Sequence, residues 1–426
     1  MQILWFVFKA MNLLIIQPTG DKFGHFGITT TMLSYELASL GHNVTVVTNK
    51  LEISKFISPG KLNFKVIEVD NGKYCIEKFE REIAIHPLKY WFRYFLNSFV
   101  ILKAALNLNK LEKFHGIYLT DCEFGVASFL LKLNSSKLPP IIMQINASNF
   151  SFKDYPGNFF KRLYKSIQKE ILRLAIGREI SAFSIFGSWH SSRLRKQLRI
   201  KSENFPIRII PDAVTYISKP LTLIEARSKL GIKYTGNIFL FLGLLRQDKG
   251  LEDLAQAINI LKNEKKDFAV IIAGFPFDYK ESEIIKLFQI DQPDNRIIHH
   301  FLSYVSDEEI SNYYFAADCL LLPYNEKYKG STGPLTKGAC TYSIPVIVSD
   351  ISEMGRITSD YNFGFVFKPG DPLELAGQMS KFLSLPSDEK NILKYNTIKF
   401  GKDNSWSAMA KRYENLFLEL QGGIKY

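Results

Sequence analysis

The feature that most constrains the fold is a repeated alternation of short apolar runs with segments of helical periodicity. The first half contains the strand-length runs "NLLIIQP", "NVTVVTN", "GIYLTD", "PIIMQIN" and "ISAFSIFGS". The second half contains "IFLFLG", "FAVIIAG", "RIIHHFL", "DCLLLPY" and "IPVIVSD". Apolar strands that alternate with helices are typical of parallel sheets covered on both faces. Two such sets in 426 residues predict an α/β chain of two doubly wound, Rossmann-like domains.

A domain boundary is expected after "IRIIPDAVTYISKP", where a strand end and prolines precede a new helix. We predict a first domain at residues 1–215 and a second at 216–404, with the amphipathic helix 405–426 packing back on the first. Ligands of open parallel sheets bind at the carboxyl ends of the strands. The cleft between two such domains facing each other is therefore the expected site.

Composition excludes several classes of protein. The four cysteines are scattered without CxxC or Cys/His ligand spacing, which argues against a disulfide framework or structural zinc and fits a reducing compartment. No apolar run is long enough to span a bilayer, and the N-terminal run has neither a basic leader nor a cleavage site. We therefore expect a cytoplasmic protein, and the choice between Met1 and Met11 as its start stays open.

The net charge of +12 is concentrated in the first half of the chain. Residues 1–215 hold about 29 Lys and Arg against 16 Asp and Glu, whereas the remainder holds about 25 against 26. The two halves are therefore expected to meet different partners.

The segment "FLGLLRQDKGLEDL" places two cations where a strand passes into a helix. Gly243 ends the strand and allows a ligand to approach the backbone, and Arg246 and Lys249 follow it. A helix N-terminus already carries free N–H groups and a partial positive charge, so added cations are favourable if an anion lies between them. The alternative is a solvated loop with two ordinary surface cations.

A second cluster lies in "LLLPYNEKYKGSTGPL". Ser331, Thr332 and Gly333 offer hydroxyls and bare N–H groups at a predicted helix start, which suits an anionic or hydroxyl-rich ligand. Simple N-capping by a serine or threonine explains the same residues without any ligand.

Taken together, these segments resemble the retaining GT-B glycosyltransferases, in particular glycosyltransferase family 4. The resemblance rests on "FLGLLRQDKG", "IIAG", "NYYFAADCLLLPY", "GSTGPL", "IPVIVSD", "GFVFKPGDPLELA" and "NSWSAMAKRYENL", in that order. It covers most of residues 205–420. The N-terminal "IIQPTGDKFGHFGITTTMLSYELASLGHNVTVVTN" looks more loosely like the family's first βαβ unit.

The resemblance implies a nucleotide-sugar donor held by the second domain, without a cofactor or a metal. Arg246 and Lys249 match the family's pair that holds the diphosphate. The donor-binding positions that it implies are Gly20, Gly243, Gly274 and Tyr304, with the last two bordering the base. No carboxylate cluster suggests a metal-binding DxD motif.

The chain departs from the family at its E-x(7)-E pattern, whose two positions fall near Gly330 and on Gly338. The sequence is similar instead to the branch in which a "GSSG-L" loop replaces that motif. Ribose and sugar contacts would then come from the second cluster together with Leu335, partly through the backbone. Glu326 is the one nearby carboxylate that could substitute.

A second departure concerns the acceptor side, where relatives often carry a histidine at a strand end. Here that strand ends in Asn146, and the other polar candidates are His25, Asp121 and Glu123. For each, a capping or loop role competes with catalysis. The leaving diphosphate can itself take the acceptor proton, so a strong protein base is not required.

The first domain also carries a basic, aromatic helical pattern in "NFFKRLYKSIQKEILRLAIGREI" and "HPLKYWFRYFLNSFVILK". Packing on a sheet explains the apolar faces but leaves the charge excess unexplained. An anionic membrane surface would attract such a domain, and the acceptor would then be lipid-linked. We find no nucleic-acid-binding motif.

The sequence therefore predicts a cytoplasmic, peripherally membrane-associated, retaining glycosyltransferase of the hexosyltransferase type. It would move a sugar from a nucleoside diphosphate to a glycan or lipid-linked acceptor in cell-surface polysaccharide synthesis. Two alternatives remain: a sugar-nucleotide epimerase of the same architecture, and a catalytically degenerate sugar-nucleotide-binding scaffold.

Overall fold

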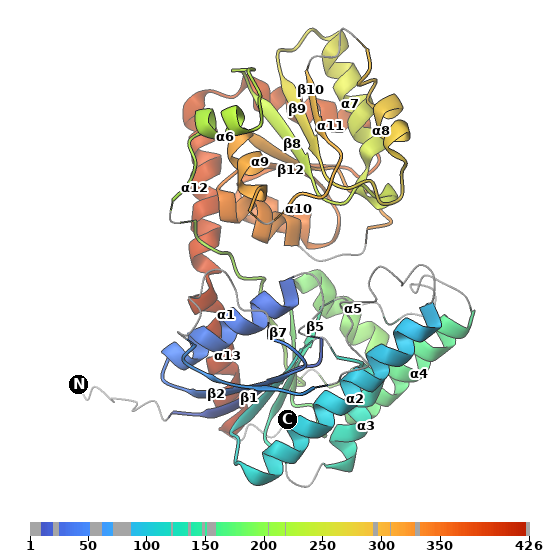
Figure 1. Ribbon diagram of the computed structural model, residues 1–426, viewed down its shortest axis with the longest axis vertical. Coiled ribbons are helices and arrows are strands. Elements are labelled where there is room, and N and C mark those ends of the chain that lie inside the picture. The colour runs from blue at the N-terminus through green and yellow to red at the C-terminus, as the bar shows by residue number, and fades with distance from the viewer. Residues whose placement is uncertain are drawn as a thin grey trace, which may run out of the picture. The chain divides into compact units, whose positions relative to one another are not determined.

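The computed structural model of the protein describes residues 10–19, 25–51, 62–70, 87–120, 122–134, 138–146, 150, 159–202, 204–217, 219–292, 297–306, 308–328 and 333–422. The chain divides into two compact units (Figure 1). The N-terminal unit comprises Met1–Pro211 and Trp406–Tyr426, and the C-terminal unit comprises Asp212–Ser405. The sequence had suggested a boundary four residues later, after residue 215.

The N-terminal unit is built on a seven-stranded sheet in the order β3-β2-β1-β4-β5-β6-β7, with every pairing parallel. The inner strands are apolar along their length because helices cover both faces of the sheet. The strands are β1 (Asn12–Gln17), β2 (Asn43–Thr48), β3 (Lys65–Glu68), β4 (Gly116–Leu119), β5 (Ile141–Ile145), β6 (Ala182–Ile185) and β7 (Ile207–Ile209).

Helices pack on both faces of this sheet. The right-handed crossover rule places α1 on one face and α2 to α5 on the other, because the strand order reverses after β3. The helices are α1 (His25–Ser39), α2 (Pro87–Leu111), α3 (Phe124–Leu133), α4 (Phe159–Ala175), α5 (Ser188–Leu198) and α13 (Trp406–Gln421). The C-terminal α13 packs beside α1 (Figure 1).

Helix α13 is held to the first sheet by buried polar contacts. The hydroxyl of Tyr413 lies 3.2 Å from that of Tyr118 and 3.1 Å from that of Ser184. Near the end of the helix, Phe417 fills the space beside Gly116, where any side chain would collide with its ring. The last helix therefore belongs to the core of the N-terminal unit although it is the most distant in sequence.

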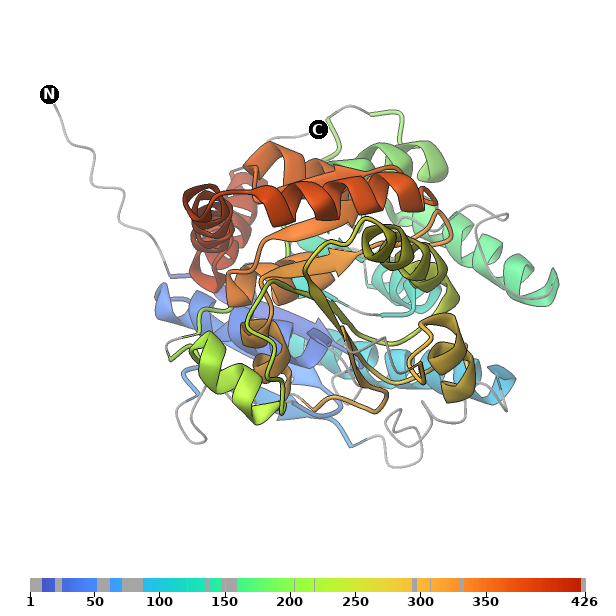
Figure 2. The same cartoon turned by 90° about the horizontal axis from the view of Figure 1, so that it is seen from above.

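The C-terminal unit has a six-stranded parallel sheet in the order β10-β9-β8-β11-β12-β13. Its strands are β8 (Ile238–Leu242), β9 (Ala269–Ala273), β10 (Ile298–Phe301), β11 (Cys319–Leu322), β12 (Val346–Ser349) and β13 (Gly364–Phe367). Its helices are α6 (Leu223–Lys229), the short η3 (Gln247–Lys249), α7 (Leu251–Asn263), α8 (Glu281–Leu287), α9 (Ile310–Ala316), the π-helix η4 (Pro334–Cys340), α10 (Ser352–Tyr361), α11 (Pro372–Ser384) and α12 (Ser387–Asp403). Helix α7 packs on α11 and α6 on α9, and Figure 2 shows α6 and α7 on opposite faces of the sheet.

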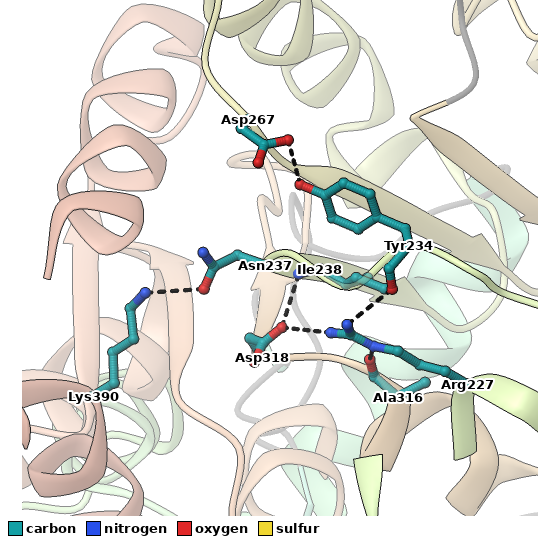
Figure 3. A network of polar contacts seen from close by, with 8 residues as sticks. All are labelled: Arg227, Tyr234, Asn237, Ile238, Asp267, Ala316, Asp318 and Lys390. Carbon is teal, nitrogen blue, oxygen red and sulfur yellow. Dashed lines mark hydrogen bonds and ion pairs between the residues drawn. The ribbon is translucent and has the colours of Figure 1, made fainter. Parts of the chain in front are cut away.

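A polar network fixes the amino edge of the second sheet (Figure 3). The buried guanidinium of Arg227 donates to the carbonyls of Ala316 and Tyr234 and to the carboxylate of Asp318, the last at 2.8 Å. Asp318 also accepts from the backbone N–H of Ile238, the first residue of β8, at 2.9 Å. The network thereby holds α6, β8 and β11 in register at the edge opposite the carboxyl ends.

Both sheets reverse their strand order at one point. In the C-terminal unit the reversal lies between β8 and β11, and such a switch point is where open α/β sheets bind ligands, at the carboxyl ends. The segments that leave β8 and β11 are therefore the first place to look for a site. Within the described ranges, no helix has the length and apolarity needed to cross a membrane.

Candidate donor site at the switch point of the C-terminal sheet

Two glycines shape the loop that leaves β8. Gly243 and Gly274 end β8 and β9 with φ of 137° and 141°, a backbone region that favours glycine. A Cβ on Gly274 would lie 1.8 Å from the carbonyl oxygen of Gly243, whereas a Cβ on Gly243 would meet nothing within 4 Å. Gly274 is thus required by packing, and Gly243 presents its backbone to open space where a ligand fits.

Arg246 is held by a neighbouring carboxylate. Its Nε and a terminal nitrogen donate to the two oxygens of Asp248 at 3.0 and 2.8 Å, a bidentate pair on the same loop. About one third of the Arg246 side chain is exposed. Because the pair is partly solvated, its contribution to stability is small, and a phosphate can replace the carboxylate in the same fork geometry.

Lys249 is the most unusual cation of the unit. Only 8% of the residue is exposed, and among the described residues it forms no ion pair. Its ammonium lies 3.6 Å from the ring centroid of Tyr324 and 4.5 Å from that of Tyr328. Burial lowers the pKa of Lys249 to about 7, the positive charge of Arg246 adds to this, and Asp248 opposes it.

The two tyrosines come from the other side of the switch point. Tyr324 lies two residues after the end of β11 and is fully buried, and Tyr328 packs against it with ring centroids 4.6 Å apart. Asn325 ties this segment to the β8 loop, since its amide donates to the carbonyl of Gln247 at 2.6 Å. Aromatic faces stabilise a buried cation by up to about 2 kcal/mol, so they hold the ammonium in place without neutralising it.

Gly250 joins this cation to helix α7. It adopts a left-handed conformation, φ 69°, and a Cβ there would lie 1.8 Å from the carbonyl oxygen of Pro323. The close approach brings the N-terminus of α7 against the segment after β11. The free N–H groups of that helix end lie beside the ammonium and the guanidinium, a donor set suited to a diphosphate. Three carboxylates lie near this donor set, Asp248 on the guanidinium and Glu252 and Asp253 in the first turn of α7.

Exposed apolar side chains border the site at the ends of β8, β9 and β10. Leu244 is 43% exposed, Phe275 50%, Phe277 63% and Tyr304 72%. The β8 and β9 loops continue to pair beyond their strands through Leu245 and Pro276. Flat apolar groups suit a planar base, and contact with the base stays a prediction for Gly274 and Tyr304.

The "GSTG" loop is only partly described. Ser331 and Thr332, two predicted donor-binding residues, lie outside the described residues, as does Gly330. Gly333 precedes η4, and Leu335 is fully buried, backbone included, so the structure leaves its predicted contact with a ligand as a prediction. Glu326 is exposed.

The position of the absent second glutamate has no space for a side chain. A Cβ on Gly338 would lie 2.4 Å from the hydroxyl of Tyr314, a buried residue whose ring stacks on Tyr342 at 4.3 Å. A carboxylate could be placed there only after the aromatic pair moved. The departure from the E-x(7)-E pattern is therefore built into the packing of η4.

In the N-terminal unit, Glu123 has a capping role. Its carboxylate accepts from the backbone N–H of Val126 at 2.6 Å and from the hydroxyl of Tyr164 at 2.9 Å. It is 1% exposed, and burial raises its pKa. These contacts favour the capping role over direct contact with an acceptor.

The other acceptor-side candidates are less defined. Asn146 follows β5, and its Oδ1 is buried without a partner among the described residues. His25 begins α1, but its side chain is not described, and Gly20 and Asp121 lie outside the described residues. The structure therefore brings Arg246, Lys249, Gly243 and Gly274 together and leaves the roles of the others as predictions.

Sequence reasoning missed the aromatic half of the site. The pair Tyr324 and Tyr328 was visible in "PYNEKYKG" as two aromatics four residues apart after a strand, but only Glu326 was considered. Asp248 was likewise overlooked as the partner of Arg246. Burial raises the pKa of Tyr328 to about 12, Arg246 opposes this rise, and the carboxylates of Asp248 and of the buried Asp212 add to it.

No group of three or more His, Cys, Asp or Glu side chains that could hold a metal ion occurs in the described part of the chain.

Comparison with known families gives one match. Residues 224–400 match the model of the family Glycosyl transferases group 1, a segment of about two fifths of the chain that lies within the C-terminal unit. It contains the glycines, cations and tyrosines described above. A search of the curated proteins found no match.

Solved structures match nearly the whole chain. A glycosyltransferase from Rickettsia africae ESF-5 is 17% identical, with a TM-score of 0.70 over 98% of this chain and 100% of that one. Sucrose-phosphate synthase from Thermosynechococcus elongatus is 15% identical, with a TM-score of 0.69 over 97% and 100%. Anabaena HepE in complex with UDP and glucose is 12% identical, with a TM-score of 0.63 over 96% and 100%. The prediction of two parallel α/β domains of the GT-B fold is confirmed.

Proposed function

We propose that the protein is a retaining glycosyltransferase of family 4 that transfers a sugar from a nucleoside diphosphate to a hydroxyl group. The observation that carries this proposal is the buried, unpaired ammonium of Lys249 beside Arg246 at the switch point of the C-terminal sheet. A buried cation without a counter-ion is costly, and a diphosphate would supply the missing charge. The family match over the same segment supports a nucleotide sugar as the source of that diphosphate.

The site stabilises the leaving group in this proposal. As the bond between the sugar and the diphosphate breaks, negative charge grows on the diphosphate oxygen, where Lys249, Arg246 and the N-terminus of α7 would meet it. The acceptor oxygen forms the new bond on the same face of the sugar, and its proton passes to the leaving diphosphate. Bound phosphates would raise the pKa of Lys249 from about 7, so that the ammonium stays protonated during the reaction.

Helix α4 supports a membrane-associated acceptor. Phe159, Leu163, Ile167 and Leu174 are 63, 43, 51 and 56% exposed, and their spacing places them on one stripe of the helix. Arg162, Lys169 and Arg173 follow along one side of this stripe, and Glu170, an exposed carboxylate within the stripe, pairs with the last two. An apolar stripe beside a row of cations is typical of helices that lie in the surface of an anionic membrane. We propose a lipid-linked acceptor for cell-surface glycan synthesis on the inner face of the membrane.

One observation favours a second candidate, a scaffold that binds nucleotide sugars without turnover. The packing around Gly338 excludes the carboxylate that relatives place there, and that carboxylate is expected to help hold the donor. The two candidates agree on donor binding and differ only in transfer.

Transfer is tested by incubating the protein with UDP-, GDP- and ADP-sugars, with and without a membrane extract as acceptor. Release of nucleoside diphosphate that requires acceptor, with retention at the anomeric carbon, is the expected result. Conversion of a free nucleotide sugar without acceptor would identify an epimerase. Binding of a nucleotide sugar with no turnover in any mixture would support the scaffold function instead.

Membrane association is tested by sedimentation with vesicles of phosphatidylcholine containing phosphatidylglycerol. Leu163→Ser/Ile167→Ser/Leu174→Ser should weaken binding strongly, because it removes the apolar stripe of α4. The matched control changes three exposed apolar residues of the C-terminal unit, Ile224→Ser/Leu373→Ser/Ile392→Ser. Equal binding by native protein and both variants would contradict the membrane role of α4.

A further inference from the structure

The N-terminal unit has an open pocket of about 640 Å³ at the amino edge of its sheet. Ser181 and Pro206, the residues before β6 and β7, contribute to its lining, together with the segments that follow α4 and α5. Ligands of this architecture are expected at the carboxyl ends of the strands. The pocket therefore lies at the opposite edge of the sheet from the expected ligand site.

Among the described residues, the lining contains four cations and no carboxylate. Arg173 and Arg178 come from the end of α4 and the turn after it, and Arg199 and Lys201 come from the segment after α5. The hydroxyls of Ser181 and Ser202 line the same space. Cations and hydroxyls that converge from separate segments are the donor set of a phosphate group.

The ordinary structural explanation accounts for only part of this charge. Cations are favourable at helix C-termini, and two helices end here with roughly half a negative charge each. Arg173 is already paired with Glu170. Arg178, Arg199 and Lys201 are exposed and lie beyond the helix ends, and within the described residues none of them forms an ion pair.

The pocket therefore has more positive charge than the helix ends and the ion pair account for. Counted over the described residues, three cations without an ion pair against two helix ends amount to about two positive charges. A phosphate monoester carries about −1.5 to −2 near pH 7, so one such group would match the surplus. Glu179 does not line the pocket, and Glu203 lies outside the described residues.

We propose that this pocket, the basal pocket, binds a phosphate monoester or diester at a site separate from the donor site. Arg178, Arg199 and Lys201 bind the phosphate oxygens, and Ser181 and Ser202 donate hydrogen bonds to the ester group. The ligand is either a soluble phosphate ester or the headgroup of an anionic lipid reached at the end of α4. The inference does not depend on transferase activity.

The test uses the full chain carrying Lys249→Met, so that the donor site does not compete for phosphate. The soluble probe is glycerol 3-phosphate, measured by calorimetry, and the lipid probe is phosphatidylglycerol vesicles, measured by sedimentation. The pocket variant adds Arg178→Gln/Arg199→Gln/Lys201→Gln. The control removes the same charge from exposed lysines elsewhere on the unit, Lys50→Gln/Lys113→Gln/Lys411→Gln.

At about fivefold per cation, the pocket variant should bind its probe about 100-fold more weakly, and the control should change severalfold at most. Loss of glycerol 3-phosphate binding alone identifies a soluble ester, and loss of vesicle binding alone identifies a lipid headgroup. Either result supports the basal pocket. The proposal is overturned if neither probe binds, or if the pocket variant and the control lose affinity equally. Circular dichroism of both variants confirms that folding is retained.

Discussion

Replacing Lys249 with methionine should remove the pH dependence of diphosphate binding. In the native protein burial and the neighbouring Arg246 hold the pKa of Lys249 at about 7, so at pH 8 most molecules carry a neutral amine. A bound diphosphate favours the ammonium and raises this pKa. Binding above pH 7 therefore takes up a proton, whereas methionine has none to gain.

The size of the effect follows from linkage. Above the pKa of the free protein, each pH unit lowers the protonated fraction tenfold, so the Kd for UDP should rise about tenfold between pH 8 and pH 9. Below pH 6.5 this dependence should vanish. The Lys249→Met variant should bind about 10- to 100-fold more weakly at pH 6.5, the cost of one hydrogen bond to a charged group. Its Kd should stay level from pH 7 to pH 9, because the phosphate itself titrates near pH 6.

The assay is calorimetric titration with UDP in two buffers of different ionisation enthalpy, which counts the protons taken up. The native protein should take up close to one proton at pH 8, and the variant none. Lys266→Met changes an exposed lysine of the same unit and should behave as native. A native Kd that stays level from pH 7 to pH 9, without proton uptake, would refute the reasoning.

Three further outcomes are expected from the contacts of Asp248, of the two loop glycines and of Asp318. Asp248→Asn should shift the break in the pH profile of UDP binding to lower pH, since Asp248 raises the pKa of Lys249; an unchanged break would contradict this. Gly274→Ala should lower the melting temperature by several degrees more than Gly243→Ala, because both substitutions strain a backbone with positive φ and only the Cβ at position 274 also meets the carbonyl of Gly243; Gly243→Ala should in addition weaken UDP binding in calorimetry, and equal melting temperatures would count against the account. Asp318→Ala should destabilise the protein by about 3 kcal/mol in urea unfolding, because it leaves the guanidinium of Arg227 buried without its partner; a loss under about 1 kcal/mol would show that the carbonyl contacts suffice.

The fold could be predicted from the sequence because the strands are continuous apolar runs. Such runs indicate parallel sheets without any knowledge of contacts. The runs "IFLFLG" and "DCLLLPY" correspond to β8 and β11 within a residue or two. The return of the last helix to the first unit was predicted together with the domain bounds. Its physical basis, the buried hydroxyl cluster of Tyr413, joins residues almost 300 positions apart and leaves no local pattern.

Only part of the candidate site could be predicted from the sequence. Arg246 and Lys249 could be predicted as ligand-binding residues because cations at a helix start conflict with the helix dipole unless an anion is bound there. The burial of Lys249 between two tyrosine rings could not be found, since it depends on β8 and β11 being neighbours at the switch point. The lack of space at Gly338 depends in the same way on Tyr314, a residue of a different helix.

The most direct test of the central claim is calorimetric titration of the native protein and of Arg246→Ala/Lys249→Ala with UDP, GDP and ADP. The account predicts that the native protein binds one of the three and that the double variant, still folded, binds none. If the folded native protein binds none of them at millimolar concentration, or the double variant binds as well as the native protein, the switch-point cations do not form a diphosphate site.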